Sequence, residues 1–236
     1  MAKLKERLAG RTGGRILDVA TAGGWFIDKL KDALKDIDEI IGIDITDREF
    51  GEARERLKDD PVSFIVMDGA NIEFADESFD TVAMAAGMHH LDDIPAVLSE
   101  MMRVLKPGGM FVLCEMYRDG QGDKQITDVM EHDWNAKIDR LLGIPHYPSL
   151  KKQKIIDYAK NLCLSRFEAQ INRCDDCPRS KGETIEKEIA EMGEQLAKVK
   201  DLPQYDELKI ERDAIVKRLR TVGVSCQQAL EIVGIK

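Results

Sequence analysis

Apolar residues follow two different spacings through the first two-thirds of the chain. Short runs rich in β-branched residues alternate with longer runs in which apolar residues recur every three or four positions. The short runs are typical of buried strands and the longer ones of amphipathic helices. Their alternation predicts an α/β fold with a mostly parallel sheet covered by helices. Strands are predicted at residues 15–19, 39–43, 61–67, 79–84 and 110–116, and helices at residues 25–37, 46–57 and 94–105.

Local signals mark the ends of two of these helices. Thr46 and Glu49 have the spacing of a capping box, so we expect a helix to open at Thr46. Asp92 and Asp93 can cap the helix that follows the fourth strand. The Lys-Pro-Gly-Gly run at residues 106–109 predicts where that helix stops.

The pattern becomes more helical after residue 116. A breaker run at residues 143–148 separates two predicted helices, and Leu202-Pro203 separates two others that should form an antiparallel hairpin. The apolar stripe from Ile185 to Val199 is expected to pack on its own domain, because its heptad spacing is too short for a coiled coil. A dimer through this hairpin is left open and is not predicted. Helices are predicted at residues 125–142, 151–161, 183–200 and 205–220, and strands at residues 165–171 and 228–235.

The composition fits one soluble domain. The chain has 236 residues, of which 43% are hydrophobic and 33% charged. Its formal net charge of −9 argues against free nucleic acid and anionic membranes as partners. No signal peptide and no run of ~20 apolar residues is present, which predicts a cytoplasmic protein with reduced thiols.

One cysteine pair has the spacing of half a zinc site. A closed structural site needs four ligands, and no second pair accompanies Cys174 and Cys177. The two aspartates between them oppose the lowered thiol pKa that a redox role requires. We therefore expect an ordinary loop there and predict no metal site.

Carboxylates and small residues gather where the predicted strands end. Asp18, Asp44 and Asp68 end the first three strands, and residues 85–91 follow the fourth. In an open α/β sheet, ligands lie beyond the carboxyl ends of the strands, near the topological switch point. Small residues let a ligand approach the backbone, and a carboxylate can accept both hydroxyls of a ribose. One adenosine-bearing ligand can therefore touch all four loops.

The ordered set of segments resembles the class I S-adenosylmethionine-dependent methyltransferases, in the broad group that includes the quinone-biosynthesis enzymes. The matching segments are residues 16–24, 42–44, 67–70, 78–91 and 104–109. The resemblance implies a single methyltransferase domain over residues 1–236, built on a doubly wound, seven-stranded, mostly parallel Rossmann-like sheet whose last strand is antiparallel. It also implies methyl transfer from S-adenosylmethionine, with S-adenosylhomocysteine as product. A small-molecule acceptor is expected because the chain is acidic and has no nucleic-acid-binding module. Two helical insertions are expected, a substrate lid at residues 118–162 and a hairpin at residues 182–222.

The resemblance also assigns contacts with the cofactor. Asp18 and the following loop would border its methionine part, and Asp44 would hold the ribose. Ile45 would pack on the adenine, and Asp68 would meet the adenine amino group. The full set of predicted cofactor-binding residues is Asp18, Ala20, Ala22, Gly23, Asp44, Ile45, Asp68, Gly69, Ala70, Ala86 and Gly87.

The first loop departs from the pattern of the family, which has glycine where this chain has Ala20 and Ala22. Alanine costs little at negative φ, but its Cβ is unfavourable at positive φ or against a ligand. We expect Ala20 to be a mild change and Ala22 to narrow the space beside the methionine moiety. Gly23 is expected to take over part of the lost role.

Methyl transfer needs an aligned acceptor and, for a hydroxyl or a protonated amine, a base. His89, His90 and Glu115 are the predicted catalytic residues near the pocket mouth. His146 and Tyr147 join them if the linker folds over as a lid. His132, at ~100° per residue, falls nearly opposite the apolar arc of its helix, so we expect it to face solvent unless that polar face covers the pocket.

Two other functions stay open. One is a catalytically inactive methyltransferase-like protein that binds the cofactor or a partner, an alternative supported by Ala22 and by the short segment of about a dozen residues before the first strand. The other is an NAD-linked oxidoreductase. It fits less well, because the first turn lacks the Gly-x-Gly-x-x-Gly fingerprint.

Overall fold

A seven-stranded sheet forms the centre of the computed structural model, which describes residues 2–173 and 182–236. The strand order is β3-β2-β1-β4-β5-β7-β6, and β7 alone runs antiparallel to its neighbours. This confirms the predicted doubly wound sheet and its antiparallel last strand. The strands are β1 Thr12–Val19, β2 Lys35–Asp44, β3 Val62–Val66, β4 Phe79–Ala85, β5 Leu105–Met116, β6 Ser165–Asn172 and β7 Ala229–Ile235.

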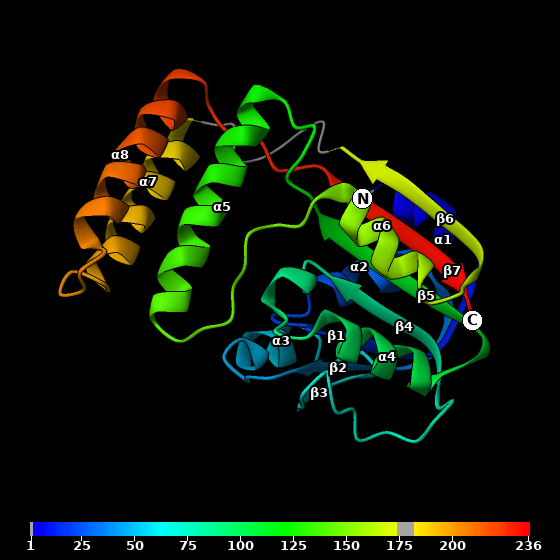
Figure 1. Cartoon of the computed structure of the whole chain (residues 1–236). Helices are drawn as coiled ribbons and strands as arrows, with labels where there is room; N and C mark the ends of the chain where they lie inside the picture. The colour runs from blue at the N-terminus through cyan, green and yellow to red at the C-terminus, as the bar shows by residue number, and fades with distance from the viewer. Residues whose placement is uncertain (1, 174–181) are drawn as a thin grey trace.

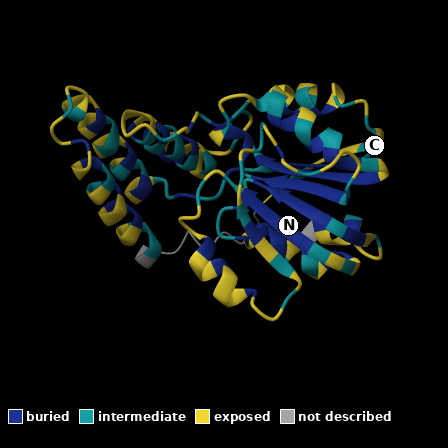
Figure 2. Ribbon diagram, turned by 90° about the horizontal axis from the view of Figure 1, so that it is seen from below, coloured by how far each residue is buried: buried dark blue, intermediate teal, exposed yellow. Residues whose placement is uncertain are grey.

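Helices cover both faces of this sheet (Figure 1). On one face, Ile16 of β1 packs with apolar residues of α1, α2 and α3. On the other, its neighbour Leu17 packs with α4 and α6. Successive strand residues thus point to two apolar layers, and Figure 2 shows the central strands as largely buried. The helices are α1 Ala2–Leu8, α2 Trp25–Ala33, α3 Phe50–Arg56, the 3₁₀ turn η1 Met88–His90, α4 Ile94–Val104, α5 Asp123–Leu141, α6 Lys152–Lys160, α7 Gly182–Ala197 and α8 Tyr205–Thr221.

Three helices stand together beside the sheet rather than on it (Figure 1). The apolar stripe of α7, including Met192 and Leu196, is buried against α8 and α5. Trp134 of α5 is 1% exposed, and its indole N–H donates to the carbonyl of Leu208 in α8 at 2.8 Å. The stripe is therefore the inner face of a hairpin packed within the chain, as predicted.

Two predicted helix ends are wrong. The helix predicted to reach residue 37 ends at Ala33, because Leu34 is extended and Lys35 already pairs with Thr12 in the sheet. The capping box at Thr46 does not form. Helix α3 starts at Phe50, and Glu49 precedes it without a side-chain cap. By contrast, Asp93 caps α4 as expected, accepting from the backbone N–H of Ala96 at 2.9 Å.

Two further expectations from the sequence concern membrane-spanning helices and the cysteine pair. None of the helices in residues 2–173 and 182–236 is long and apolar enough to cross a membrane. The Cys174 and Cys177 pair lies outside the described residues.

The Trp134 contact gives a test of the three-helix packing. Trp134→Phe removes the indole N–H that donates to the Leu208 carbonyl and leaves a small void. It should lower the free energy of unfolding by about 2 kcal/mol in urea titrations. Trp25, the other tryptophan of the chain, is 41% exposed, so Trp25→Phe should change it by no more than about 0.5 kcal/mol. Equal effects of the two substitutions would contradict this account of the packing.

Candidate functional site

A cavity of about 470 Å³ opens at the carboxyl ends of β1 to β4. Strand order reverses between β1 and β4, so the loops after these strands diverge and leave a crevice. Nine of the predicted cofactor-binding residues line it, namely Ala20, Ala22, Asp44, Ile45, Asp68, Gly69, Ala70, Ala86 and Gly87. Asp18 and Gly23 are the two that do not.

Two backbone N–H groups hold the Asp44 carboxylate in place. The N–H of Ala22 donates to one oxygen at 3.0 Å and that of Thr46 to the other at 3.2 Å. The carboxylate thereby ties the loop after β1 to the end of β2. The next residue, Ile45, is 69% exposed and lies in the cavity wall. A fixed acceptor therefore stands beside an exposed apolar surface.

The alanines of the first loop both have left-handed backbones. Ala20 has a φ of 54° and Ala22 a φ of 43°, conformations that favour glycine and cost an L-residue about 1–2 kcal/mol. The expectation that Ala20 is a mild change is therefore wrong. Its Cβ also stands only 2.9 Å from where a Cβ on Gly87 would lie, so residue 87 must be glycine.

Gly23 and Gly24 have different roles in this turn. Gly24, not Gly23, has the positive φ, 69°, and precedes α2. A Cβ on Gly23 would lie 2.8 Å from a carboxylate oxygen of Glu49. Gly23 thus makes room for Glu49, which does line the cavity.

Asp18 lies beneath the cavity wall and is 1% exposed. The Thr21 hydroxyl donates to its Oδ2 at 2.6 Å, whereas Oδ1 has no hydrogen-bond partner among the described residues. Burial raises the pKa of this carboxyl to about 7, against the opposing effect of Thr21, and the nearby Asp44 charge adds to the rise. Asp18 is therefore a buried acid that a cation nearby would ionise.

Sequence reasoning missed part of the lining. Trp25, Arg48 and Glu49 border the cavity, and so do Ile144 and Pro145 from the linker after α5. An exposed tryptophan directly after the glycine turn was a signal for the first of these. The linker residues lie in the segment predicted as a lid, but the sequence did not indicate that these two would reach the cavity.

The predicted catalytic residues separate into one at the cavity and two behind it. His90 lines the cavity, and burial and then the neighbouring His89 lower its pKa. His89 is 4% exposed, and its Nδ1 lies 2.8 Å from Oε1 of the buried Glu115. The other oxygen of Glu115 accepts from the N–H of Met88 at 2.9 Å. Glu115 therefore anchors the turn that carries both histidines.

His132 does not face solvent, contrary to the sequence-based expectation. Its side chain is 12% exposed and packs against the rings of His89 and His146. A helical wheel shows one apolar arc on α5, but α5 is covered on two sides, by the hairpin and by the histidines. Burial lowers the pKa of His146 to about 4, although Asp139, whose Oδ2 lies 2.7 Å from Nδ1, opposes the shift.

Part of the predicted lid reaches the cavity. The Tyr147 hydroxyl donates to Asp92 at 2.6 Å, and the Tyr147 N–H donates to the carbonyl of His89 at 2.7 Å. These bonds hold the linker beside Ile144 and Pro145 in the cavity wall. Helix α5 itself packs on α7 and α8.

Comparison with known proteins identifies the core of this fold. Residues 17–113 match the family described as methyltransferase domain. The chain is 30% identical over 164 residues to methyltransferase GfsG of Streptomyces halstedii, covering 66% of this chain and 57% of that protein. It is 36% identical over 106 residues to demethylmenaquinone methyltransferase of Bacteroides fragilis, 43% of each. The chain thus spans about half the length of the curated relatives it matches.

A solved structure shares the fold over the whole chain. It is Haemonchus contortus phosphoethanolamine N-methyltransferase 2 in complex with phosphomonomethylethanolamine and S-adenosylhomocysteine. The TM-score is 0.58 at 18% identity, with 100% of this chain and 51% of that chain covered.

The strained loop predicts a stabilising substitution. Ala22→Gly removes the Cβ at a positive φ and should raise the free energy of unfolding by about 1 kcal/mol, measured by urea titration. Ala75→Gly, at an exposed alanine outside the left-handed region, is the control and should bring no gain. A loss of stability in Ala22→Gly would show that the Cβ makes contacts worth more than the strain.

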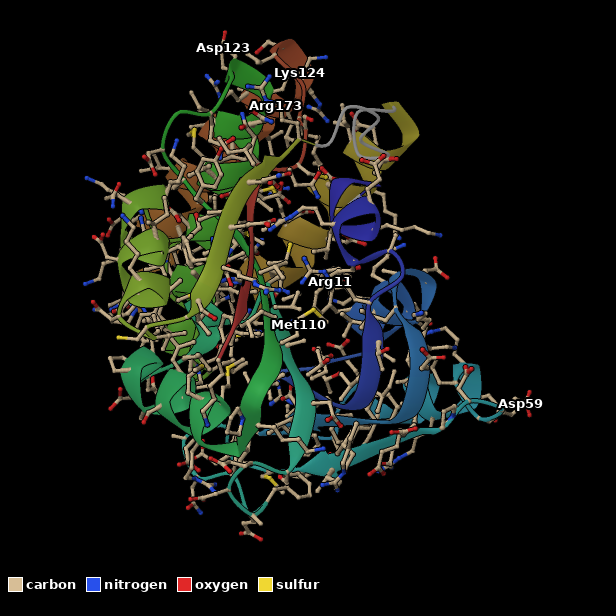
Figure 3. The ribbon with its side chains drawn as sticks, turned by 90° about the vertical axis from the view of Figure 1, so that its right-hand side faces the viewer. Arg11, Asp59, Met110, Asp123, Lys124 and Arg173 are labelled. Atoms are coloured by element: carbon tan, nitrogen blue, oxygen red, sulfur yellow. The ribbon has the colours of Figure 1, made fainter. Side chains whose placement is uncertain are left out.

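The raised pKa of Asp18 predicts how stability depends on pH. Between its ordinary value and about 7, the unfolded chain loses this proton while the folded chain keeps it, so stability falls as pH rises. Asp18→Asn removes this loss, and its stability relative to the original protein should improve by about 3 kcal/mol between pH 5 and pH 8. Asp59→Asn is the control, because Asp59 is exposed to solvent and does not line the cavity (Figure 3). A stability difference that stays constant across this range would contradict a buried acid at Asp18.

Proposed function

Because residues 17–113 belong to the methyltransferase domain family, we propose that this protein transfers a methyl group from S-adenosylmethionine to a small-molecule acceptor. The observation that carries the proposal is the single cavity at the switch point, whose wall holds nine predicted cofactor contacts from four separate loops. Residues far apart in the chain meet there, which supports the binding of one adenosine-bearing ligand.

Asp44 and Ile45 would hold the nucleoside of the cofactor. Each Asp44 oxygen accepts one backbone N–H and keeps a further lone-pair direction, so the carboxylate can also accept the two ribose hydroxyls. Ile45 offers an exposed apolar surface on which an adenine can pack. Asp68, whose Oδ1 accepts from the N–H of Ala70 at 2.8 Å, would meet the adenine amino group.

The first loop fits the methionine part. One oxygen of the buried Asp18 carboxyl has no hydrogen bond to any residue that the structure describes. Burial also raises the pKa of this carboxyl. A cationic amino group above the loop would favour ionisation of this acid, and the ionised acid would in turn favour the cation. Ala20 and Ala22 leave the cavity open at about 470 Å³, so their side chains do not close the site.

The bound cofactor would supply an electrophilic sulfonium methyl group, and the protein would align the acceptor with it. His90 stands in the wall of the cavity with a pKa below its ordinary value, so its ring is neutral near pH 7 and can take a proton from an acceptor. His89 and Glu115 would position this ring from behind. Ile144 and Pro145 would shape the acceptor end.

A small molecule fits this site better than a macromolecule. The cavity has the volume of a small-ligand pocket, and the chain carries a net charge of −9. The catalytically inactive alternative rested in part on closure of the site by Ala22. The N–H of Ala22 instead orients Asp44 toward the cavity.

The proposal predicts that cofactor binding depends on Asp44. In calorimetric titrations with S-adenosylmethionine and with S-adenosylhomocysteine, Asp44→Ala should weaken binding ~10–100-fold, because charge-assisted hydrogen bonds to the ribose are lost. Asp47→Ala removes an exposed carboxylate three residues away that does not line the cavity, and it should bind as the original protein does. Failure of the folded original protein to bind either ligand would overturn the proposed function.

A further inference from the structure

All four histidines of the chain meet in one cluster. His89 and His90 come from the turn after β4, His132 from α5, and His146 from the linker that follows α5. The ring centroids of contacting pairs lie 4.3 to 5.5 Å apart. Three separate segments, at least 14 residues apart, thus bring every imidazole of the protein to one place.

Three of these rings converge as metal ligands do. One nitrogen each of His89, His132 and His146 lies within 4.8 Å of the others. The Nε2 atoms of His132 and His146 are 3.2 Å apart. Two nitrogens bound to one tetrahedral zinc ion at ~2.0–2.1 Å are separated by roughly 3.4 Å. The two rings therefore already stand at the spacing of shared coordination.

Each of the three histidines has a carboxylate at its outer nitrogen. Glu115 Oε1 lies 2.8 Å from Nδ1 of His89, and Asp139 Oδ2 lies 2.7 Å from Nδ1 of His146. A proton held on Nδ1 by a carboxylate leaves the lone pair of Nε2 free for a metal. This carboxylate–histidine arrangement is the usual outer shell of a metal site.

The third carboxylate is that of Asp133, which lies beside His132. His132 Nδ1 and Asp133 Oδ1 are buried, 3.6 Å apart, and neither has a hydrogen-bond partner among the described residues. Without a metal, the two Nε2 atoms of His132 and His146 must share one proton. An ion bound to both would move the proton of His132 to Nδ1, where it faces Asp133.

We propose that His89, His132 and His146 bind a divalent transition-metal ion of the zinc class. Imidazole ligands select such ions over magnesium and calcium, which prefer oxygen. Three protein ligands leave a fourth position open. The fourth histidine, His90, packs on His89 and His146 and lines the cavity, so the ion would lie next to the acceptor end. The bound ion would also connect α5 and the linker to the turn after β4. This inference does not depend on the proposed methyl transfer.

Zinc binding to the protein without an affinity tag is the direct test. After treatment with a chelator and its removal, titration with zinc chloride should show one equivalent bound and a higher melting temperature. Cobalt chloride should bind with the same stoichiometry and give the intense visible absorption of tetrahedral coordination. Absence of stoichiometric zinc binding by the folded original protein would overturn the proposal, and it would leave a hydrogen-bonded histidine cluster.

Variants then identify the ligands. His132→Gln and His146→Gln should each weaken zinc binding by more than 10-fold, and Asp133→Asn, outside the ligand set, by ~10–100-fold. His90→Gln is the matched control from the same cluster and should retain one equivalent. Loss of binding in His90→Gln with retention in His132→Gln would overturn the assignment of ligands. If a glutamine variant fails to fold, the cobalt spectrum of the original protein still decides whether nitrogen ligands surround one ion.

Discussion

The reversal of strand order between β1 and β4 is the constraint on which the site depends. Because β2 and β3 lie on one side of β1 and β5 on the far side of β4, the loops that follow β1 and β4 leave the sheet toward opposite faces. The backbone must separate there, and the cavity occupies the gap. The carboxyl ends of β2 and β3 then contribute their own loops to the same opening. The site is thus a consequence of chain topology before any side chain is considered.

Hydrogen bonds to two carboxylates hold the strained backbone of the loop after β1. Ala20 and Ala22 both adopt positive φ, which costs free energy that the rest of the structure must offset. The N–H of Ala22 donates to Asp44, and the hydroxyl of Thr21 donates to Asp18, so two carboxylates fix the turn between the alanines. The same two carboxylates are those that the cofactor would use. In the proposed function, Asp18 and Asp44 therefore both hold the loop in shape and bind the cofactor.

Local patterns in the sequence predicted the sheet well, because its central strands contain apolar runs that are buried on both faces. The seven strands and the hairpin follow from such patterns. Helix ends were harder. Pairing of Lys35 with Thr12 ended α2 early, and the bond from the Thr46 N–H to Asp44 belongs to a loop, not to a helix start. The segment that holds Ile144 was predicted as a lid, but nothing local indicates which of its residues reach the cavity wall.

Helix α5 shows why the face of a helix cannot be assigned from its own apolar arc. Trp134 and His132 are two residues apart, about 200° around the helix, so they point in nearly opposite directions. Trp134 is buried in the three-helix group, and His132, whose side chain is 12% exposed, packs among the histidines behind the cavity. Because the hairpin of α7 and α8 positions one side of α5, it also sets where His132 meets His89 and His146. The described residues of the hairpin do not line the cavity, but the hairpin is in this way connected to the wall of the site through a single helix.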